Sequence, residues 1–299
     1  MCGAPRLIRL LHHDRGRYVS TPYPERTAGV IEVGGVDVAF SDTGGEGTPI
    51  VLLHSTGGNA AVDFSHLSPM LAARHRVIGL DFAVASDNHE PTVVQLCRQV
   101  LAVIDACSAD RPVDVVGYSL GAVVAAALAA DHPTRIEHVI LVAGWVKTTR
   151  HQRALTASCR VASAAEPGAR NELTLFTQFS PAYLAARTHS ELEALGSARP
   201  IPEPELARRW NVADEVDLSE TVVRVSAPTL VIGCTRDLFA PREHAECLFG
   251  AIEDSRLAFV DSGHAVLTER PAEVFGLVDA FVSGRMTVPA GTIVPTTDV

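Results

Sequence analysis

The feature that most constrains the fold of this chain is a short apolar strand that runs directly into a helix around one serine. Residues 113–118 read Val-Asp-Val-Val-Gly-Tyr, Ser119 follows, and an Ala- and Val-rich stretch begins immediately afterwards. Gly117 and Gly121 flank the serine in a Gly-x-Ser-x-Gly run. In so tight a turn the flanking positions nearly touch, and glycine fits because it has no Cβ. The pattern predicts a nucleophile elbow, with the serine oxygen at the positive amino end of the next helix.

The nucleophile-elbow motif also predicts an acid and then a histidine further along the chain. Residues 257–264 read Leu-Ala-Phe-Val-Asp-Ser-Gly-His, an apolar strand and a turn that place His264 on a loop beyond the strand. Residues 229–232 form another β-branched, apolar run, and Asp237 lies in the loop that follows it. Asp261, three residues before the histidine, is the competing acid, and we expect it instead to shape the turn at the strand end.

These three segments together resemble the α/β-hydrolase superfamily. Residues 139–144 (Val-Ile-Leu-Val-Ala-Gly) resemble the strand that leads into the lid of such proteins. Residues 50–58 (Ile-Val-Leu-Leu-His-Ser-Thr-Gly-Gly) resemble the His-Gly segment that supplies half of the oxyanion hole. The likeness covers roughly residues 29–283.

The resemblance implies a Ser-His-Asp triad. Ser119 would attack an acyl carbonyl, His264 would carry its proton to the leaving group, and Asp237 would fix the histidine tautomer. The backbone N–H groups of Thr56 and Leu120 would hold the oxyanion. A serine at the nucleophile position argues against haloalkane dehalogenase and epoxide hydrolase chemistry, which uses an aspartate there in similar folds.

Three departures from the family pattern indicate a divergent member. Ser55 stands where a glycine usually follows the histidine, which bears on the shape of the oxyanion loop. Ala122 stands where a second glycine often follows the elbow. Residues 81–87 read Asp-Phe-Ala-Val-Ala-Ser-Asp and lack the glycine-rich run that is usual after the fourth strand.

Strand and helix patterns alternate along the rest of the chain. Strands are expected at 49–54, 77–81, 113–117, 139–142, 229–233 and 255–260, and helices near 59–73, 91–107, 119–131, 241–250 and 271–282. A hairpin is expected at 31–33 and 36–41, around two glycines. The alternation predicts an α/β fold, a mostly parallel twisted sheet flanked by helices on both faces. The expected domains are an irregular leader (1–28), a core (29–144 and 222–283), a helical lid insertion (145–221) and a loose tail (284–299).

The insertion concentrates large aromatic side chains in a chain that is only 5% aromatic. Active sites of open α/β sheets lie beyond the carboxyl ends of the strands, so a lid inserted there is expected to cover the serine. Trp145 begins the insertion and is the preferred pocket residue. The candidate pocket residues are His54, Ser55, Tyr118, Trp145, Phe176, Phe179, Tyr183 and Trp210. We expect them to favour a mainly apolar acyl group of moderate size.

Composition restricts the partners and the location. The net charge of −10 argues against nucleic acid and anionic membranes as partners. The expected partner is a small-molecule acyl substrate, as the triad implied by the resemblance suggests, and the oligomeric state stays open. No apolar stretch reads as a signal peptide, and six scattered cysteines read as reduced thiols, so a cytoplasmic location is expected. No metal or cofactor is implied, since no His-Glu-x-x-His run or similar ligand spacing occurs.

The sequence therefore predicts a serine hydrolase that acts on an acyl ester, lactone or thioester. Two alternatives stay open. The same triad could serve carbon–carbon hydrolysis, perhydrolysis or the elimination of an acyl group in a biosynthetic tailoring step. Alternatively, the chain could be a catalytically silent member that binds a ligand.

Overall fold

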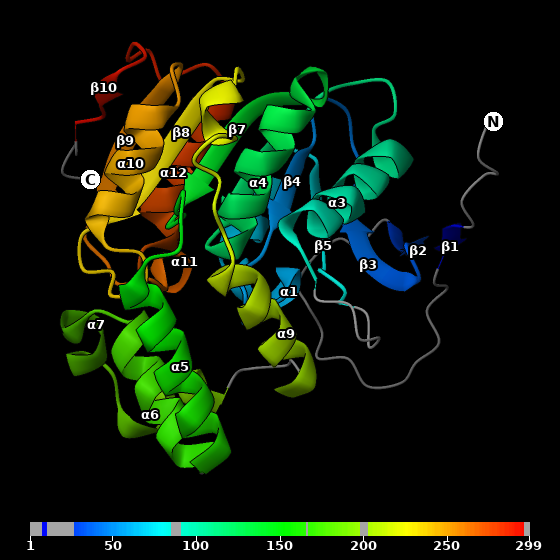
Figure 1. Cartoon of the computed structure of the whole chain (residues 1–299). Helices are drawn as coiled ribbons and strands as arrows, with labels where there is room; N and C mark the ends of the chain where they lie inside the picture. The colour runs from blue at the N-terminus through cyan, green and yellow to red at the C-terminus, as the bar shows by residue number, and fades with distance from the viewer. Residues whose placement is uncertain (1–7, 11–26, 85–90, 166, 198–202, 296–299) are drawn as a thin grey trace.

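The computed structural model describes residues 8–10, 27–84, 91–165, 167–197 and 203–295. Within these ranges the strands form one sheet in the order β1-β2-β3-β5-β4-β6-β7-β8-β9-β10, with helices on both faces (Figure 1). The strands are β1 (Ile8–Leu10), β2 (Thr27–Val33), β3 (Val36–Asp42), β4 (Ile50–Leu53), β5 (Val77–Leu80), β6 (Val113–Tyr118), β7 (Ile136–Val142), β8 (Thr229–Cys234), β9 (Ser255–Val260) and β10 (Thr292–Ile293). The α/β fold and its mostly parallel sheet are as the alternating pattern predicts.

Strand direction changes only at one side of the sheet. The pairs β1/β2, β2/β3 and β3/β5 are antiparallel, and the remaining neighbours are parallel. The β2–β3 hairpin turns at Gly34 and Gly35, whose φ angles of 61° and 85° suit the turns that glycine favours. The strands β4, β5, β6 and β8 are buried at every position, as parallel strands covered on both faces are.

Two apolar layers cover the sheet. On one face lie α3 (Val93–Cys107), α4 (Leu120–Asp131) and α10 (Arg242–Ala251), and on the other lie α2 (Leu67–Ala72), α11 (Val266–Glu269) and α12 (Pro271–Val282). The side chains of β4 alternate between them, since Val51 and Leu53 join the first layer while Ile50 and Leu52 join the second. The remaining short elements outside the insertion are α1 (Ala60–Asp63), η1 (Pro133–Arg135) and η2 (Val222–Arg224).

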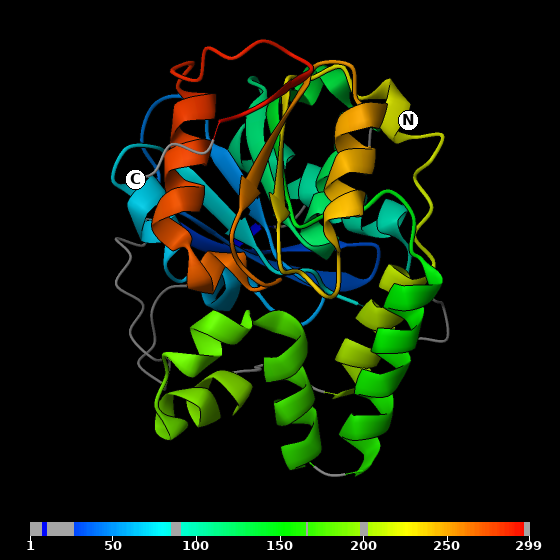
Figure 2. The same ribbon diagram turned by 90° about the vertical axis from the view of Figure 1, so that its left-hand side faces the viewer.

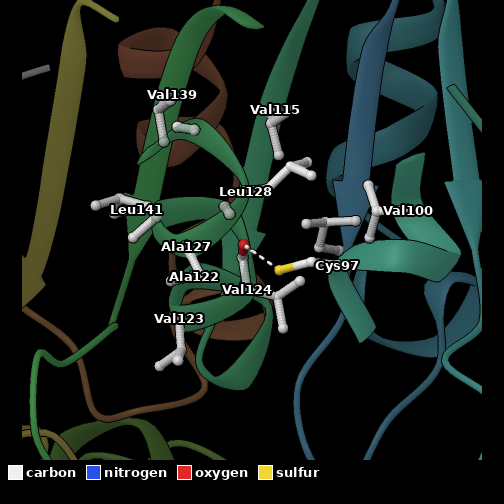
Figure 3. Packing of buried hydrophobic residues seen from close by; sticks show 14 of the residues in the cluster. Cys97, Val100, Val115, Ala122, Val123, Val124, Ala127, Leu128, Val139 and Leu141 are labelled. Atoms are coloured by element: carbon white, nitrogen blue, oxygen red, sulfur yellow. Dashed lines mark hydrogen bonds between the residues drawn. The ribbon is translucent and has the colours of Figure 1, made fainter. Parts of the chain in front are cut away.

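Helix α4, which follows the serine, is held rigidly in the first layer. All its residues from Leu120 to Ala130 are buried, and their small side chains let α3 and the sheet approach closely (Figure 3). The Cys97 thiol of α3 donates to the Val124 carbonyl oxygen at 3.6 Å. Burial raises the pKa of this thiol to about 12, so Cys97 acts as a small apolar residue.

A helical insertion separates β7 from β8. Its described helices are α5 (Arg150–Ala165), α6 (Pro167–Gln178), α7 (Pro181–Ala185), α8 (His189–Ser197) and α9 (Glu203–Asp214). Figures 1 and 2 show these helices gathered at one end of the sheet. The Ala265 N–H, in the loop after β9, donates to the Gln178 carbonyl at the end of α6, and Arg209 of α9 reaches the loops after β4 and β5. The insertion therefore lies at the carboxyl end of the sheet, where the loops that carry Ser119, Asp237 and His264 also lie.

Some local expectations differ from the structure. The helix expected over 59–73 is two helices, α1 and α2, because Pro69 lacks an N–H and its ring blocks a helical path through the preceding turn. The leader is not wholly irregular, since β1 pairs with Gly29–Ile31 of β2. The tail is not wholly loose either, since β10 pairs with β9 and the Val294 N–H donates to the Leu257 carbonyl. Residues 1–7, 11–26, 85–90, 166, 198–202 and 296–299 lie outside the described residues.

Within the part of the chain that the structure describes, no helix combines the length and the apolar character that crossing a membrane requires.

Candidate active site

Ser119 occupies a strained turn between β6 and α4. Its φ and ψ angles are 56° and −118°, a conformation that costs an L-residue about 1–3 kcal/mol. A Cβ on Gly117 would lie 2.2 Å from the Gly121 carbonyl oxygen, and one on Gly121 would lie 2.0 Å from the Leu53 carbonyl oxygen. Both glycines are thus required by backbone contact, as the motif predicts.

The structure brings the three predicted triad residues into one hydrogen-bonded chain. His264 Nε2 lies 2.8 Å from Ser119 Oγ, and His264 Nδ1 lies 2.7 Å from Asp237 Oδ2. The second oxygen of Asp237 accepts the N–H groups of Phe239 at 2.7 Å and Ala240 at 2.8 Å. A carboxylate only accepts, so the Nδ1 proton of His264 points at Asp237 and the Nε2 lone pair faces the serine hydroxyl.

Burial separates Asp237 from the competing acid. Ser119, Asp237 and His264 are 2%, 5% and 2% exposed, so their interactions are little screened by water. The Asp261 side chain is 58% exposed and accepts hydrogen bonds from Arg236 and Thr235. The Arg236 hydrogen bond lowers the pKa of Asp261. Asp261 therefore shapes the turn after β9, as expected, and does not contact His264.

The segment Ser55–Gly58, here called the oxyanion loop because it is expected to supply an oxyanion donor, lies beside the start of α4. A Cβ on Gly121 would lie 2.8 Å from the His54 carbonyl oxygen, so the two segments touch. The hydrogen bonds of α4 begin with the Ala122 and Val123 N–H groups, which both donate to the Ser119 carbonyl oxygen, so the Leu120 N–H precedes the first of them. The loop is anchored from one side by Asp63, whose Oδ2 accepts the Ser55 N–H at 2.7 Å. Asp63 also fills the space beneath Gly58, because a Cβ there would lie 2.1 Å from its Oδ1.

His54 braces this loop from below. Its Nδ1–H donates to the Ser55 carbonyl oxygen at 2.7 Å, and its Nε2 accepts the Phe82 N–H at 2.9 Å. Burial, with a smaller contribution from Arg209, holds the pKa of His54 well below its usual value, so the ring is neutral. Both ring nitrogens are occupied by backbone groups, so His54 has no nitrogen left for a ligand and the expectation of a pocket role is corrected to a supporting one.

Aromatic rings surround His264. The Tyr118 hydroxyl donates to the His264 carbonyl oxygen at 3.0 Å, and the two ring centroids are 5.5 Å apart. The Phe239 ring centroid lies 5.1 Å from that of His264. Trp145 packs edge-on against Phe239 and is 1% exposed, with its indole N–H bonded to Thr148. Trp145 is thus a core residue one ring removed from His264, which corrects its assignment as the foremost pocket residue.

The other insertion aromatics lie in three different environments. Phe179 stacks on Tyr183 at 5.3 Å and packs with Ala265, the residue after the triad histidine. Phe176 is 65% exposed on α6, because it lies on the helix face opposite the packed side, and its expected pocket role is wrong. Trp210 is buried on α9 under the Arg160 guanidinium, 5.7 Å from its ring centroid, and so stabilises the insertion.

Sequence reasoning missed several residues that position the site. Phe239, Asp63, Glu269 and Arg209 each contact a site loop. Glu269 is buried and joins the Ser180 hydroxyl and N–H to the Gly263 N–H, which precedes His264. These residues carry no motif, and nothing in the sequence distinguishes Arg209 from the adjacent Arg208.

Across the described ranges no group of three or more His, Cys, Asp or Glu side chains is placed to hold a metal ion.

Comparisons with known proteins agree with this fold. The family model of the alpha/beta hydrolase fold matches residues 48–271. The pyrrolizixenacetamide deacetylase of Xenorhabdus hominickii is 27% identical over 259 residues, which cover 84% of this chain and 97% of that protein. The putative carbamate hydrolase RutD of Variovorax paradoxus is 26% identical over 238 residues, covering 77% of this chain and 89% of that protein.

Among solved structures, the enol-lactonase from Burkholderia xenovorans shares the fold with a TM-score of 0.76 at 23% identity, covering 85% of this chain and 99% of that one. The chain therefore belongs to the α/β-hydrolase family and is an α/β-hydrolase enzyme.

Proposed function

We propose that this enzyme is a serine hydrolase that cleaves an acyl ester, lactone or thioester of a mainly apolar small molecule through an acyl-enzyme. The observation that carries the proposal is the continuous hydrogen-bonded chain from Ser119 Oγ through His264 to Asp237. Two similar proteins are named a deacetylase and a putative carbamate hydrolase, which supports hydrolysis as the reaction class.

The proposed reaction has two halves. Ser119 Oγ attacks the acyl carbonyl carbon as its proton passes to His264 Nε2, and the same proton is delivered to the departing oxygen or sulfur. Water then attacks the acyl group on Ser119, giving its proton to His264, and the carboxylic acid leaves as the serine proton returns. Asp237 holds the His264 ring in place throughout, because its Oδ2 accepts the His264 Nδ1–H while its Oδ1 accepts two backbone N–H groups.

The oxyanion is proposed to bind the backbone N–H groups of Thr56 and Leu120. Each donor contributes roughly 3 kcal/mol when it is aimed at the position that the oxyanion takes in the transition state. The contact between Gly121 and the Leu53–His54 backbone supports this assignment, because it fixes the distance between the two donor segments.

The insertion is proposed to act as a lid that selects an apolar acyl group. Its support is the cluster of Leu175, Phe179 and Ala265, with Tyr183 packed against it, which brings apolar side chains next to His264. Each large apolar side chain buried against a ligand contributes about 1.5–3 kcal/mol. Esters of one leaving group with acetyl, hexanoyl and succinyl chains test this by their kcat/KM values. Hexanoyl is expected to be preferred, a preference for succinyl would refute the apolar pocket, and equal rates would refute the lid.

The reaction itself is tested by a fluorophosphonate probe together with Ser119→Ala. Labelling at Ser119, with activity lost in the variant, is expected. An unlabelled protein would favour a silent ligand-binding member, whereas labelling without hydrolysis of esters, lactones or thioesters would favour another reaction on the same triad.

A further inference from the structure

Arg209 connects the helical insertion to the oxyanion loop. It lies on α9 and is 3% exposed. Its Nη1 donates to the Gly58 carbonyl oxygen at 2.8 Å, and its Nη2 donates to the Phe82 carbonyl oxygen at 2.5 Å and to Glu205 at 2.6 Å. The two carbonyls belong to the loops that follow β4 and β5, so one guanidinium joins α9 to both.

Arg209 also bonds to the residues that support the oxyanion loop. Phe82 donates its N–H to His54, and His54 donates to the Ser55 carbonyl oxygen. Arg209 holds the carbonyl of the same Phe82 and the far end of the loop at Gly58. Asp63 supports the loop from the core side. Among the described residues, Arg209 is the only charged side chain of the insertion that is shown to bond to Gly58.

The charges around Arg209 strengthen its contacts with the two loops. Glu205, Asp81 and Asp63 all lie close enough to act on the charge of the arginine. Without Arg209, these carboxylates would face a half-buried site with less positive charge, and two buried carbonyl groups would lose their donor. A flat, rigid guanidinium reaches both carbonyls at once, which a lysine ammonium on a flexible stem does less well.

We propose that Arg209 is a positioning residue that makes the geometry of the oxyanion hole depend on docked α9. The inference rests on the proposed serine hydrolase function. Arg209 acts through the Thr56 N–H. Thr56 lies between Ser55, which Asp63 holds, and Gly58, which Arg209 holds. Because an oxyanion forms only in the transition state, misplacement of this donor lowers kcat and leaves KM nearly unchanged.

The test compares three arginine variants with one ester substrate. Arg209→Met removes every donor and keeps the apolar stem, and Arg209→Lys keeps the charge. Arg160→Met is the matched control, since Arg160 also ties an insertion helix to α9, through Asp214 and Asn211, but reaches no site loop. For each variant kcat, KM, the melting temperature and the inhibition constant of a trifluoromethyl ketone that mimics the tetrahedral intermediate are measured.

Arg209→Met should lower kcat by roughly 10- to 100-fold, a part of the 10²–10³ that the loss of a whole oxyanion donor costs. KM should change by less than about threefold, the ketone should bind more weakly in proportion to kcat, and Arg209→Lys should be intermediate. Arg160→Met should keep kcat within about twofold even where its melting temperature falls.

Two results would overturn the inference. One is Arg209→Met with a kcat within about twofold of the parent, and the other is an equal loss in Arg160→Met, which would mean that general loosening of the insertion is responsible. If the proposed serine hydrolase function is itself wrong, Ser119→Ala will keep its activity. An inactive Ser119→Ala beside an unimpaired Arg209→Met would refute only the role of Arg209.

Discussion

Replacing Asp237 with asparagine should abolish most of the activity by inverting the histidine tautomer. In the parent, Asp237 Oδ1 accepts two backbone N–H groups and Oδ2 accepts His264 Nδ1–H. An asparagine carbonyl must take the place of Oδ1, because an NH₂ group there would face the N–H donors of Phe239 and Ala240. The carboxamide NH₂ then points at His264 Nδ1, which becomes an acceptor, and the proton moves to Nε2.

The size of the effect follows from these contacts. Flipping the amide to restore the tautomer would give up two hydrogen bonds, each contributing about 1 kcal/mol, and would oppose donor to donor. The wrong tautomer therefore persists, and His264 Nε2–H cannot accept the Ser119 proton. A loss of roughly 10⁴ in kcat is expected, or about 5.4 kcal/mol in the activation barrier. The melting temperature should change by about 4 °C or less, because both backbone hydrogen bonds remain.

The assay is steady-state ester hydrolysis by Asp237→Asn and by the control Asp261→Asn. The exposed Asp261 carboxylate accepts hydrogen bonds from Arg236 and Thr235, so its variant should stay within about twofold of the parent. An Asp237→Asn enzyme that keeps more than about a tenth of the parent kcat would refute the tautomer argument. A larger loss in Asp261→Asn would show that the acid had been misassigned.

Three further predictions concern the nucleophile, the elbow and the sheet. Ser119→Ala should lower kcat by roughly 10⁴ to 10⁶ with an unchanged melting curve, since the hydroxyl serves the reaction and not packing. Gly144→Ala should reduce the free energy of unfolding in urea by about 1–3 kcal/mol, because the new Cβ would lie 2.6 Å from that of Ala122, and Ala122→Gly should restore it. The hydrogen bond with Asp114 raises the pKa of His138 above 6.5, so this pair should stabilise the fold fully below that pH and progressively less as pH rises through the raised pKa. The free energy of unfolding in urea, measured at a series of pH values from 6.5 upward, should decline in the parent and decline less in Asp114→Asn.

Much of the core could be predicted from the sequence, because its glycine spacing and apolar strand patterns fit the fold that the structure shows. The run around Ser119 has the glycine spacing that only a strand–turn–helix can use, and the structure shows the backbone contacts that demand both glycines. The acid and histidine segments each follow an apolar strand, so their loops had to meet Ser119 at the carboxyl end of a parallel sheet. The departure at Ala122 also has a local explanation, because Gly144 leaves room for its methyl group.

The supporting residues were not predictable, because their roles depend on which distant segments meet. Arg209 lies more than a hundred residues from Gly58 and Phe82, and an arginine on a polar helix normally faces solvent. The predicted pocket roles of Trp145 and Phe176 were wrong for the same reason. An aromatic residue in an insertion can be buried in the core, as Trp145 is, or exposed to solvent, as Phe176 is. The β10 strand was missed because two residues at a sheet edge leave almost no periodic signal.

The central claim is that Ser119 is the nucleophile of this enzyme, and trapping it tests that claim most directly. The protein is incubated with a fluorophosphonate, and the adduct is located by intact mass and peptide mapping, with Ser119→Ala and Asp261→Asn treated in parallel. The account predicts one phosphonyl group per chain on Ser119, equal labelling of Asp261→Asn and none of Ser119→Ala. An adduct on another residue, or equal labelling of Ser119→Ala, would contradict it.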